Sequence, residues 1–367
     1  MTNKETLFFI AKCLTISLEE KNRNEIELIL KTTDMDWEEV VKASTSHYVL
    51  PAMYCNFKRA DFLKYLPADL AGYMKYITDL NRDRNKQIIQ QAKKLNSLLL
   101  DNDIRPIFLK GTGNILEGLY QDIGERMVGD IDFLFSEKDF FKAIDILKNY
   151  NYCKQENALD YFSGVRHYSR LVKEENIAAV EIHKEVTIEK HRGEFNCKMI
   201  SEDAQLINDF SVLSFENQLS LSIISIQIND YGFDLKKFSL RNAYDVFLLS
   251  KKVNTKKTIS NFTELKSPLN CFLAICYVAF GEINSLEYHK TEETDNYLSI
   301  FDSLLLNERK RKSRIKLKYA EFFIKKRLSI LYKSLFYKEY RDWVLKRVLD
   351  KNWQREKMVQ LGLKKRK

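Results

Sequence analysis

Asp130 and Asp132 are the residues of this sequence whose type and spacing most directly predict chemistry. They open an apolar run that continues through residues 133–135, so we expect a strand over 130–135. Residues two apart on a strand face the same side, which would place the two Cα atoms about 6–7 Å apart. The carboxylates would repel, and removing one would relieve that repulsion, unless a cation such as Mg²⁺ lies between them. An exposed polar strand face remains the alternative.

A third carboxylate, Glu181, falls on another predicted strand near residues 177–183. On a neighbouring strand it would complete a site for two metal ions, which activates an attacking oxygen and stabilises the leaving one. His183 follows Glu181 by two residues and so would share its face. It could position a phosphate or an acceptor hydroxyl, or make a structural hydrogen bond to a neighbouring strand.

The turn Lys110-Gly111-Thr112-Gly113 lies between a predicted strand and a predicted helix. Backbone N–H groups at such a helix start, together with a hydroxyl, could bind a phosphate. Arg126 lies in the loop that leads to the aspartate pair. Each of these features alone is common in structural connections, and only their order on these elements is specific.

In this order the motifs resemble the polymerase-β-type nucleotidyltransferases, and within them the uncharacterised bacterial nucleotidyltransferase family. The resemblance rests on four motifs, which are Leu109-Lys110-Gly111, Arg126, Asp130-Ile131-Asp132 and Glu181-Ile182-His183. It extends to residues 47–51 and 240–245, and so covers roughly residues 40–250. The sequence departs from the wider superfamily in having Thr112 where Gly or Ser follows the first glycine, and in a longer segment between Gly111 and Asp130.

This resemblance implies a mixed β-sheet flanked by helices and transfer of a nucleotidyl group from a nucleoside triphosphate, such as ATP, to a hydroxyl, with release of pyrophosphate. It implies that Asp130, Asp132 and Glu181 hold Mg²⁺ or Mn²⁺ and are the catalytic residues. It further implies phosphate contacts for a second set of residues, namely Lys110, Gly111, Thr112 and Arg126. The acceptor stays open among a small molecule, a protein side chain and an RNA end.

Arg241 lies four residues before Asp245 in a predicted helix. This spacing favours an ion pair within the helix, which is our interpretation of both residues. A contact from Arg241 to the nucleotide or the acceptor is the alternative.

The elements expected around these motifs are mostly helical. Helices are predicted through the first hundred residues, including one capped by Asp36 and a long one that starts after Pro67 and runs to about residue 102. Strands and helices alternate from residue 104 to 183. From residue 202 onward we expect helices, at 215–229, 240–251 and 268–280. The predicted class is α+β, with a nucleotidyltransferase core (103–200) between an N-terminal helical domain (1–102) and a C-terminal one (201–307), followed by a basic helical tail (308–367).

The composition is that of a globular protein. The 367 residues are 45% hydrophobic and 30% charged, and 11 Gly and 4 Pro favour long helices over a β-sandwich. We expect no membrane-spanning helix and no signal peptide. The six cysteines include no CxxC pair, which favours reduced thiols in a cytoplasmic protein.

The net charge of +9 is unevenly distributed. Residues 308–367 hold 22 of the 60 Lys and Arg residues but only 6 of the 51 acidic ones, which gives this segment +16 and leaves −7 for the rest. The segment could pack as solvated amphipathic helices, lie peripherally on an anionic membrane surface, or bind nucleic acid phosphates. Two alternative functions follow: a toxin-like nucleotidyltransferase that acts on RNA or protein, and a catalytically inactive scaffold that binds a nucleotide or a membrane.

Overall fold

The computed structural model describes residues 2–155 and 166–360, except for the side chains of five residues in the last helix. The chain divides into two compact units, residues 1–159 with 166–308, and residues 160–165 with 309–367. The domain boundaries predicted at residues 102, 200 and 307 stay predictions. The last seven residues of the predicted tail lie outside the described residues.

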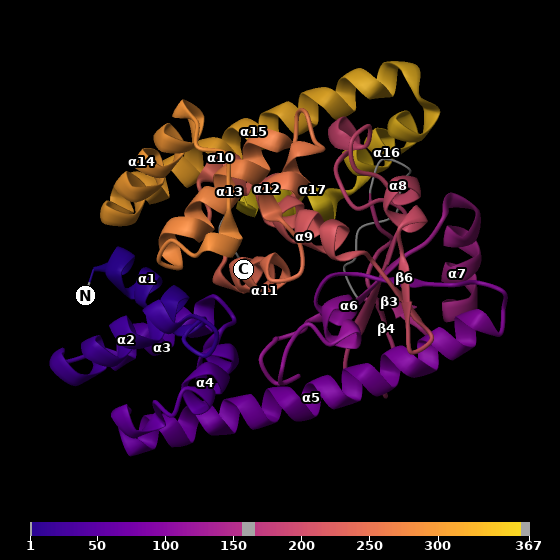
Figure 1. Ribbon diagram of the computed structural model, residues 1–367. Helices are drawn as coiled ribbons and strands as arrows, with labels where there is room; N and C mark the ends of the chain where they lie inside the picture. Colours follow the sequence, from indigo (N-terminus) through magenta and orange to yellow (C-terminus); the bar gives the residue numbers. More distant parts are fainter. Residues whose placement is uncertain (1, 156–165, 361–367) are drawn as a thin grey trace. The chain divides into compact units, whose positions relative to one another are not determined.

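Helices form the first hundred described residues, as predicted (Figure 1). They are α1 (Asn3–Cys13), α2 (Glu20–Thr32), α3 (Trp37–Ser46), α4 (Leu50–Arg59), the 3₁₀ turn η1 (Leu63–Tyr65) and α5 (Ala68–Leu100). Asp36 caps α3, where its carboxylate accepts the backbone N–H of Glu39 at 3.1 Å. Pro67 stands immediately before α5, which confirms the predicted start of the long helix.

Buried carboxamides fix α5 to the strands and loops that carry the site. Asn85 donates to the carbonyls of Ile123 and Arg126 at 2.6 and 2.7 Å, and Gln91 donates to the carbonyl of Ala178 at 2.9 Å. These hydrogen bonds satisfy backbone groups that a loop under a helix would otherwise leave unpaired. Figure 1 shows α5 running along one side of the sheet. The helix therefore holds the segment before Asp130 at its centre and the segment before Glu181 in its C-terminal half.

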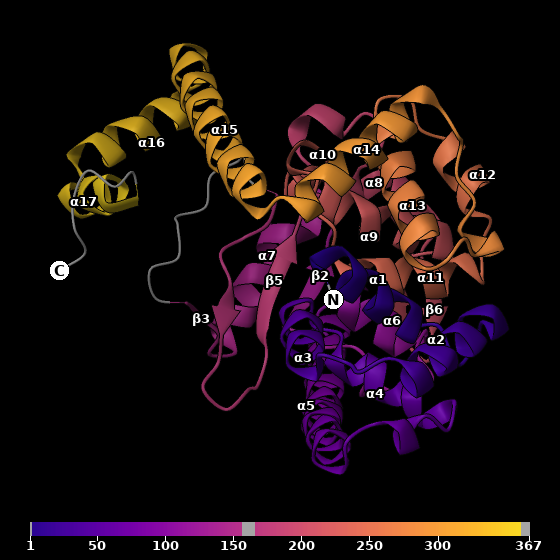
Figure 2. The ribbon, with the colours of Figure 1, turned by 90° about the vertical axis from the view of Figure 1, so that its left-hand side faces the viewer.

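Seven strands form one mixed sheet in the order β3-β4-β5-β2-β1-β7-β6. The strands are β1 (Ile107–Phe108), β2 (Asp130–Leu134), β3 (Cys153–Lys154), β4 (Leu171–Val172), β5 (Ala179–His183), β6 (Gln205–Ile207) and β7 (Phe210–Val212). Central β2 pairs antiparallel with β1 and parallel with β5. Figure 2 shows β2 and β5 side by side. The connecting segments hold α6 (Lys110–Glu117), α7 (Glu137–Asn149), η2 (Glu189–His191) and α8 (Cys197–Glu202).

The hairpin of β6 and β7 corrects the prediction that residues after 202 are helical. Its two-residue turn, Asn208 and Asp209, has φ values of 47° and 70°. Positive φ at both positions is typical of the tight hairpin turn that Asn and Asp tolerate best. β7 then pairs parallel with β1, so this hairpin extends the sheet beyond the strands predicted from the sequence.

The helices that follow are α9 (Phe215–Ile224), the π-helical turn η3 (Ser225–Asn229), α10 (Gly232–Leu235), α11 (Leu240–Ser250), α12 (Thr255–Ser260), α13 (Lys266–Ala279), η4 (Asn284–Leu286) and α14 (Glu292–Leu306). The three helices predicted here are confirmed at 215–229, 240–250 and 266–279. Helix α13 is apolar on all sides and buried from Pro268 to Cys276, as a central core helix must be. The α+β class, mostly helical, is therefore confirmed.

The second unit is built from α15 (Glu308–Phe336), α16 (Lys338–Leu349) and α17 (Lys351–Gln360). Helix α17 folds back beside α16 (Figure 2), and the indole rings of Trp343 and Trp353 lie 6.4 Å apart. The guanidinium of Arg327 on α15 lies 5.8 Å from the ring of Trp353. None of the described helices combines the length and the apolar character that crossing a bilayer requires.

One exposed contact ties the segment after β5 to the core helix α13. The carboxylate of Glu194 accepts the backbone N–H groups of Thr263, Glu264 and Leu265 at 3.0, 2.7 and 3.2 Å. Although partial burial opposes ionisation, these hydrogen bonds and the Thr263 hydroxyl lower the pKa of Glu194 to about 2. They satisfy three N–H groups just before α13 begins.

Because its folded pKa lies below its unfolded pKa, ionised Glu194 stabilises the fold above about pH 4.5, and this contribution is lost as the pH falls toward 2. We expect Glu194→Gln to lower the free energy of unfolding at pH 7 by only about 1 kcal/mol, because solvent screens the exposed carboxylate. Urea unfolding at pH 7 and at pH 3 would measure this, with exposed Glu174→Gln as the control. If Glu194→Gln lowered the free energy of unfolding equally at both pH values, the stabilisation would not come from the ionised carboxylate.

Candidate active site

The register of two parallel strands brings the polar side chains together. β2 and β5 pair with Asp132 opposite Glu181, Asp130 opposite Ala179, and Leu134 opposite His183. The intervening side chains of both strands are fully buried in the core, namely Ile131, Phe133, Val180 and Ile182. Because strand residues alternate between faces, the polar residues share the opposite face. The predicted shared face of Asp130 and Asp132 and of Glu181 and His183 follows from this pairing.

Asp132 lies at the centre of the cluster and is 7% exposed. Its Oδ1 accepts a hydrogen bond from the ammonium of Lys110 at 2.6 Å and lies 2.8 Å from Nε2 of His183. The same Nε2 is 3.6 Å from Oε2 of Glu181. Lys110 and His183 therefore lie beside Asp132, which faces Glu181 on the neighbouring strand. The repulsion between carboxylates that the sequence predicted is thus offset by the ammonium of Lys110.

Arg170, just before β4, is the site residue that the sequence analysis missed. Its Nη2 forms an ion pair with Asp130, and its Nε lies 3.7 Å from Oε1 of Glu181. β4 pairs antiparallel with β5, which brings Arg170 to this face of the sheet. The sequence around Arg170 carries no motif, and only the strand pairing reveals its position.

The charges of the cluster alter the pKa values of its carboxyl groups. Burial raises the pKa of Asp132, but Lys110 and His183 outweigh this and hold it well below its usual range. Burial and the charge of Asp132 oppose ionisation of Glu181, yet the nearby His183 and the charge of Lys110 lower its pKa. Burial and the nearby carboxylates raise the pKa of Asp130 despite Arg170. The pKa values of Asp132 and Glu181 are thus lowered, whereas that of Asp130 is raised.

Helix α6 begins beside this cluster at the predicted turn. A Cβ atom at Gly113 would lie 2.7 Å from the carbonyl oxygen of Phe108, so only glycine allows α6 to pack this closely on β1. The buried hydroxyl of Thr112 donates to the carbonyl of Asp130 at 3.0 Å and ties the helix to β2. Lys110, the first helical residue, has a φ of 51°, a conformation uncommon outside glycine.

Arg126 lies behind the start of α6 in a buried ion pair. Its Nε and Nη2 donate to the carboxylate of Asp245 at 3.0 and 2.9 Å, and its Nη1 donates to the carbonyl of Met127 at 2.8 Å. A Cβ at Gly111 would come within 3.4 Å of the guanidinium carbon. The structure therefore brings Arg126 next to Gly111, with its N–H groups turned toward Asp245 and Met127.

The structure corrects the predicted ion pair between Arg241 and Asp245 within helix α11. Asp245 accepts hydrogen bonds from Arg126 and from the hydroxyl of Tyr120, instead of pairing with Arg241. The guanidinium of Arg241 lies 5.0 Å from the ring of Tyr48, and its buried Nε has no hydrogen-bond partner. An i,i+4 spacing allows a pair but cannot exclude a better partner from elsewhere in the chain. A contact from Arg241 to nucleotide or acceptor stays a prediction.

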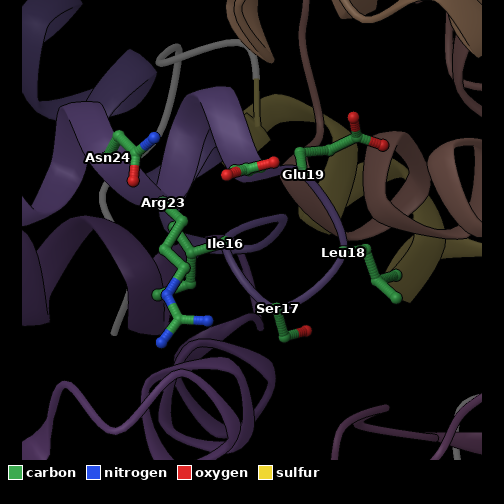
Figure 3. Close-up of a pocket in the computed structure, with 7 residues that line it drawn as sticks. Ile16, Ser17, Leu18, Glu19, Arg23 and Asn24 are labelled. Atoms are coloured by element: carbon green, nitrogen blue, oxygen red, sulfur yellow. The ribbon is translucent and has the colours of Figure 1, made fainter.

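An open pocket of about 440 Å³ lies where α1 leads into α2 (Figure 3). Its lining consists of Ile16, Ser17, Leu18, Glu19, Glu20, Arg23 and Asn24. None of these residues belongs to the carboxylate cluster, so this pocket is separate from the candidate site.

Three side chains of the cluster fit a divalent cation. Asp132, Glu181 and His183 each offer one ligand atom, and these atoms lie within 4.8 Å of one another. Carboxylate oxygens suit Mg²⁺ and Mn²⁺, and an imidazole nitrogen is also a common ligand of transition metals. Lys110 already lies on the Asp132 oxygen, where a positive charge is favoured. Asp130 is not among the three, so its predicted role as a metal ligand stays a prediction.

Comparison with protein families shows the family of this chain. The family model described as uncharacterised nucleotidyltransferase matches residues 33–280, which is more than half of the chain. The chain belongs to this family. The match spans α3 to α13, and so includes all the residues that form the candidate site of this nucleotidyltransferase family member.

Solved structures add similarity at a low level. The crystal structure of JHP933 from Helicobacter pylori is 14% identical, with 64% of this chain and 96% of that chain covered and a TM-score of 0.29. A second H. pylori chain, described as a "putative nucleotidyltransferase", is 16% identical, with 62% and 96% covered and the same TM-score. No curated protein sequence matches the chain.

Proposed function

We propose that this protein is a Mg²⁺- or Mn²⁺-dependent nucleotidyltransferase of the polymerase-β type. It would transfer a nucleoside monophosphate from a nucleoside triphosphate to an acceptor hydroxyl. The observation that carries this proposal is the pairing of Asp132 with Glu181, which brings both carboxylates and His183 within ligand distance at the start of α6. Membership of the nucleotidyltransferase family supports the reaction class.

In this reaction the acceptor oxygen forms a bond to the α-phosphorus, and the bond from that phosphorus to the α–β bridging oxygen breaks. The hydroxyl proton passes to a basic group or to water, and pyrophosphate leaves. Asp132, Glu181 and His183 would hold the divalent cation, with Asp130 on the same face of β2. When bound, the cation would offset the phosphate charge and stabilise the leaving oxygen.

The chain's own contribution is positioning and positive charge. The N–H groups of Gly111 and Thr112 in the first turn of α6 would face the β- and γ-phosphates, and the Thr112 hydroxyl keeps that turn against β2. Lys110 would supply a positive charge at the same place. Arg126, with its N–H groups directed to Asp245, would act by holding the start of α6. These groups would stabilise the negative charge on the phosphates in the transition state, and the reaction would need no covalent enzyme intermediate.

Incubation of the purified protein with each α-³²P-labelled nucleoside triphosphate, with and without Mg²⁺ or Mn²⁺, tests this proposal. Cell extract would serve as the source of acceptor. We expect label in a product only when both protein and metal are present. A labelled small molecule, protein or RNA would identify the acceptor class, and the last two would favour the toxin-like alternative.

A second candidate function is a nucleotide-binding scaffold without turnover. It is favoured by the ion pairs of Lys110 with Asp132 and of Arg170 with Asp130, because these cations already balance the carboxylates. Metal-dependent nucleotide binding with no labelled product from any nucleotide would support the scaffold and contradict catalysis.

Lys110→Ala should raise KM for the nucleoside triphosphate about tenfold, with a smaller change in kcat. The variant removes a positive charge from the first turn of α6, where the β- and γ-phosphates would bind. Steady-state kinetics would measure this, with the exposed α5 residue Lys94 changed to alanine as the matched control. A lower kcat at unchanged KM would contradict a role in phosphate binding.

A further inference from the structure

One face of α15 exposes a continuous stripe of large apolar side chains. Leu317, Ile324, Leu328, Leu331 and Leu335 are each 53–71% exposed. At 3.6 residues per turn their spacing places all five within about 60° of arc, along roughly 27 Å of helix. Scattered exposed leucines are common on protein surfaces, but an aligned row of five is not.

This stripe is not the face through which α15 packs in its own unit. Arg327 lies 4.0 Å from the ring of Phe323 and 5.8 Å from that of Trp353 on α17, and Ile330 is buried. Phe323 and Ile330 lie more than about 100° from the centre of the stripe, and Arg327 lies at its edge. The helix therefore has two apolar faces, of which one is packed and the other is exposed.

Basic residues flank the stripe on both sides. Lys318 and Lys325 lie on one side, and Lys316 and Arg327 lie on the other. Glu321, an acidic residue at the edge of the stripe, forms ion pairs with Lys318 and Lys325 at 2.8 and 2.6 Å. Residues 308–367 hold 22 basic against 6 acidic residues, so the positive charge extends over the whole segment.

We propose that α15 lies in the plane of an anionic membrane surface, with the stripe in the acyl boundary and the flanking Lys and Arg residues at the phosphate level. A helix with an exposed row of leucines between cationic flanks has the chemistry that anionic lipids attract, since burial of apolar area adds to attraction between opposite charges. This inference goes beyond the proposed function and does not depend on it.

Two other partners fit these observations less well. Nucleic acid phosphates would pair with the basic residues but would leave the leucine stripe in water. A second copy would cover the stripe, yet it would bring together two segments that each carry a net charge of +16. The exposed residues Leu345, Val348 and Leu349 on α16 add apolar surface to the same unit.

Flotation of the full-length protein with vesicles tests the proposal. We expect binding to phosphatidylcholine vesicles that contain phosphatidylglycerol, weak binding to phosphatidylcholine alone, and weakening with salt. The double variant Leu328→Asn/Leu331→Asn should reduce the partition coefficient at least about tenfold. Leu28→Asn, at a residue of α2 that is 62% exposed, is the matched control and should bind as the wild type does. Both variants should keep the wild-type circular dichroism spectrum.

Equal binding of wild type and the double variant would overturn the proposal, as would equal binding to neutral and anionic vesicles or no vesicle binding. Two further measurements distinguish the rival partners. RNA binding that competes with vesicles and is unaffected by the double variant would assign the segment to nucleic acid. A concentration-dependent dimer that the double variant abolishes, without vesicle binding by the wild type, would assign the stripe to self-association.

Discussion

Asp132→Asn is expected to reduce nucleotidyl transfer by about 10³-fold or more. The carboxylate is opposite Glu181, contacts Lys110 and His183, and is one of the three groups that fit a divalent cation. An amide keeps the shape but loses the charge that binds a cation. Initial rates of label incorporation would measure the loss, with the exposed α5 residue Asp83 changed to asparagine as the control. Activity within a few-fold of wild type would contradict the assignment of the site.

The same variant should also lose stability. The sequence analysis expected removal of one carboxylate to relieve repulsion, but the structure shows the ammonium of Lys110 paired with Asp132. Loss of the Asp132 carboxylate would leave the Lys110 ammonium without its ion-pair partner, which would lower the free energy of unfolding by about 2–4 kcal/mol at neutral pH. The lowered pKa of Asp132 means that the stabilisation is present above its unfolded pKa and disappears in strong acid. Urea unfolding at pH 7 that shows a more stable variant would support the repulsion argument instead.

Arg126→Ala should lower the free energy of unfolding by about 3–5 kcal/mol. Arg126 and Asp245 are 8% and 3% exposed at the side chain and join the loop before β2 to helix α11. Among the described residues, truncation would leave the hydroxyl of Tyr120 as the remaining side-chain donor to the buried Asp245 carboxylate. Because Arg126 also lies against Gly111, we expect the start of α6 to loosen. Urea unfolding at pH 7 measures the effect.

The double variant Arg126→Met/Asp245→Leu separates the charge from the packing. It removes both members of the pair and should recover much of the stability lost by Arg126→Ala, since no unpaired charge remains. Arg105→Ala, at an exposed residue between α5 and β1, is the matched control. A loss below about 1 kcal/mol for Arg126→Ala would show that water or another group replaces the guanidinium.

Much of the fold and part of the site could be predicted from local sequence. The cap at Asp36, the start of α5 after Pro67 and the strand at Asp130 each depend on neighbours a few residues apart. The shared face of Asp130 and Asp132 also follows from strand periodicity, because alternate side chains point to opposite sides of a sheet. The β6–β7 hairpin escaped, although Asn208 and Asp209 carry the local turn signal, as did the short strand β3.

The sequence alone therefore determined many of the elements and the polar faces of β2 and β5, since these depend on contacts within a few residues. Which polar groups meet depended on the tertiary structure. Antiparallel pairing of β4 brought Arg170 to Asp130, and the packing of α11 turned Asp245 to Arg126 instead of Arg241. Ion pairs between residues 40 and 119 positions apart follow from strand order and helix packing, because the spacing of residues within one element carries no information about another.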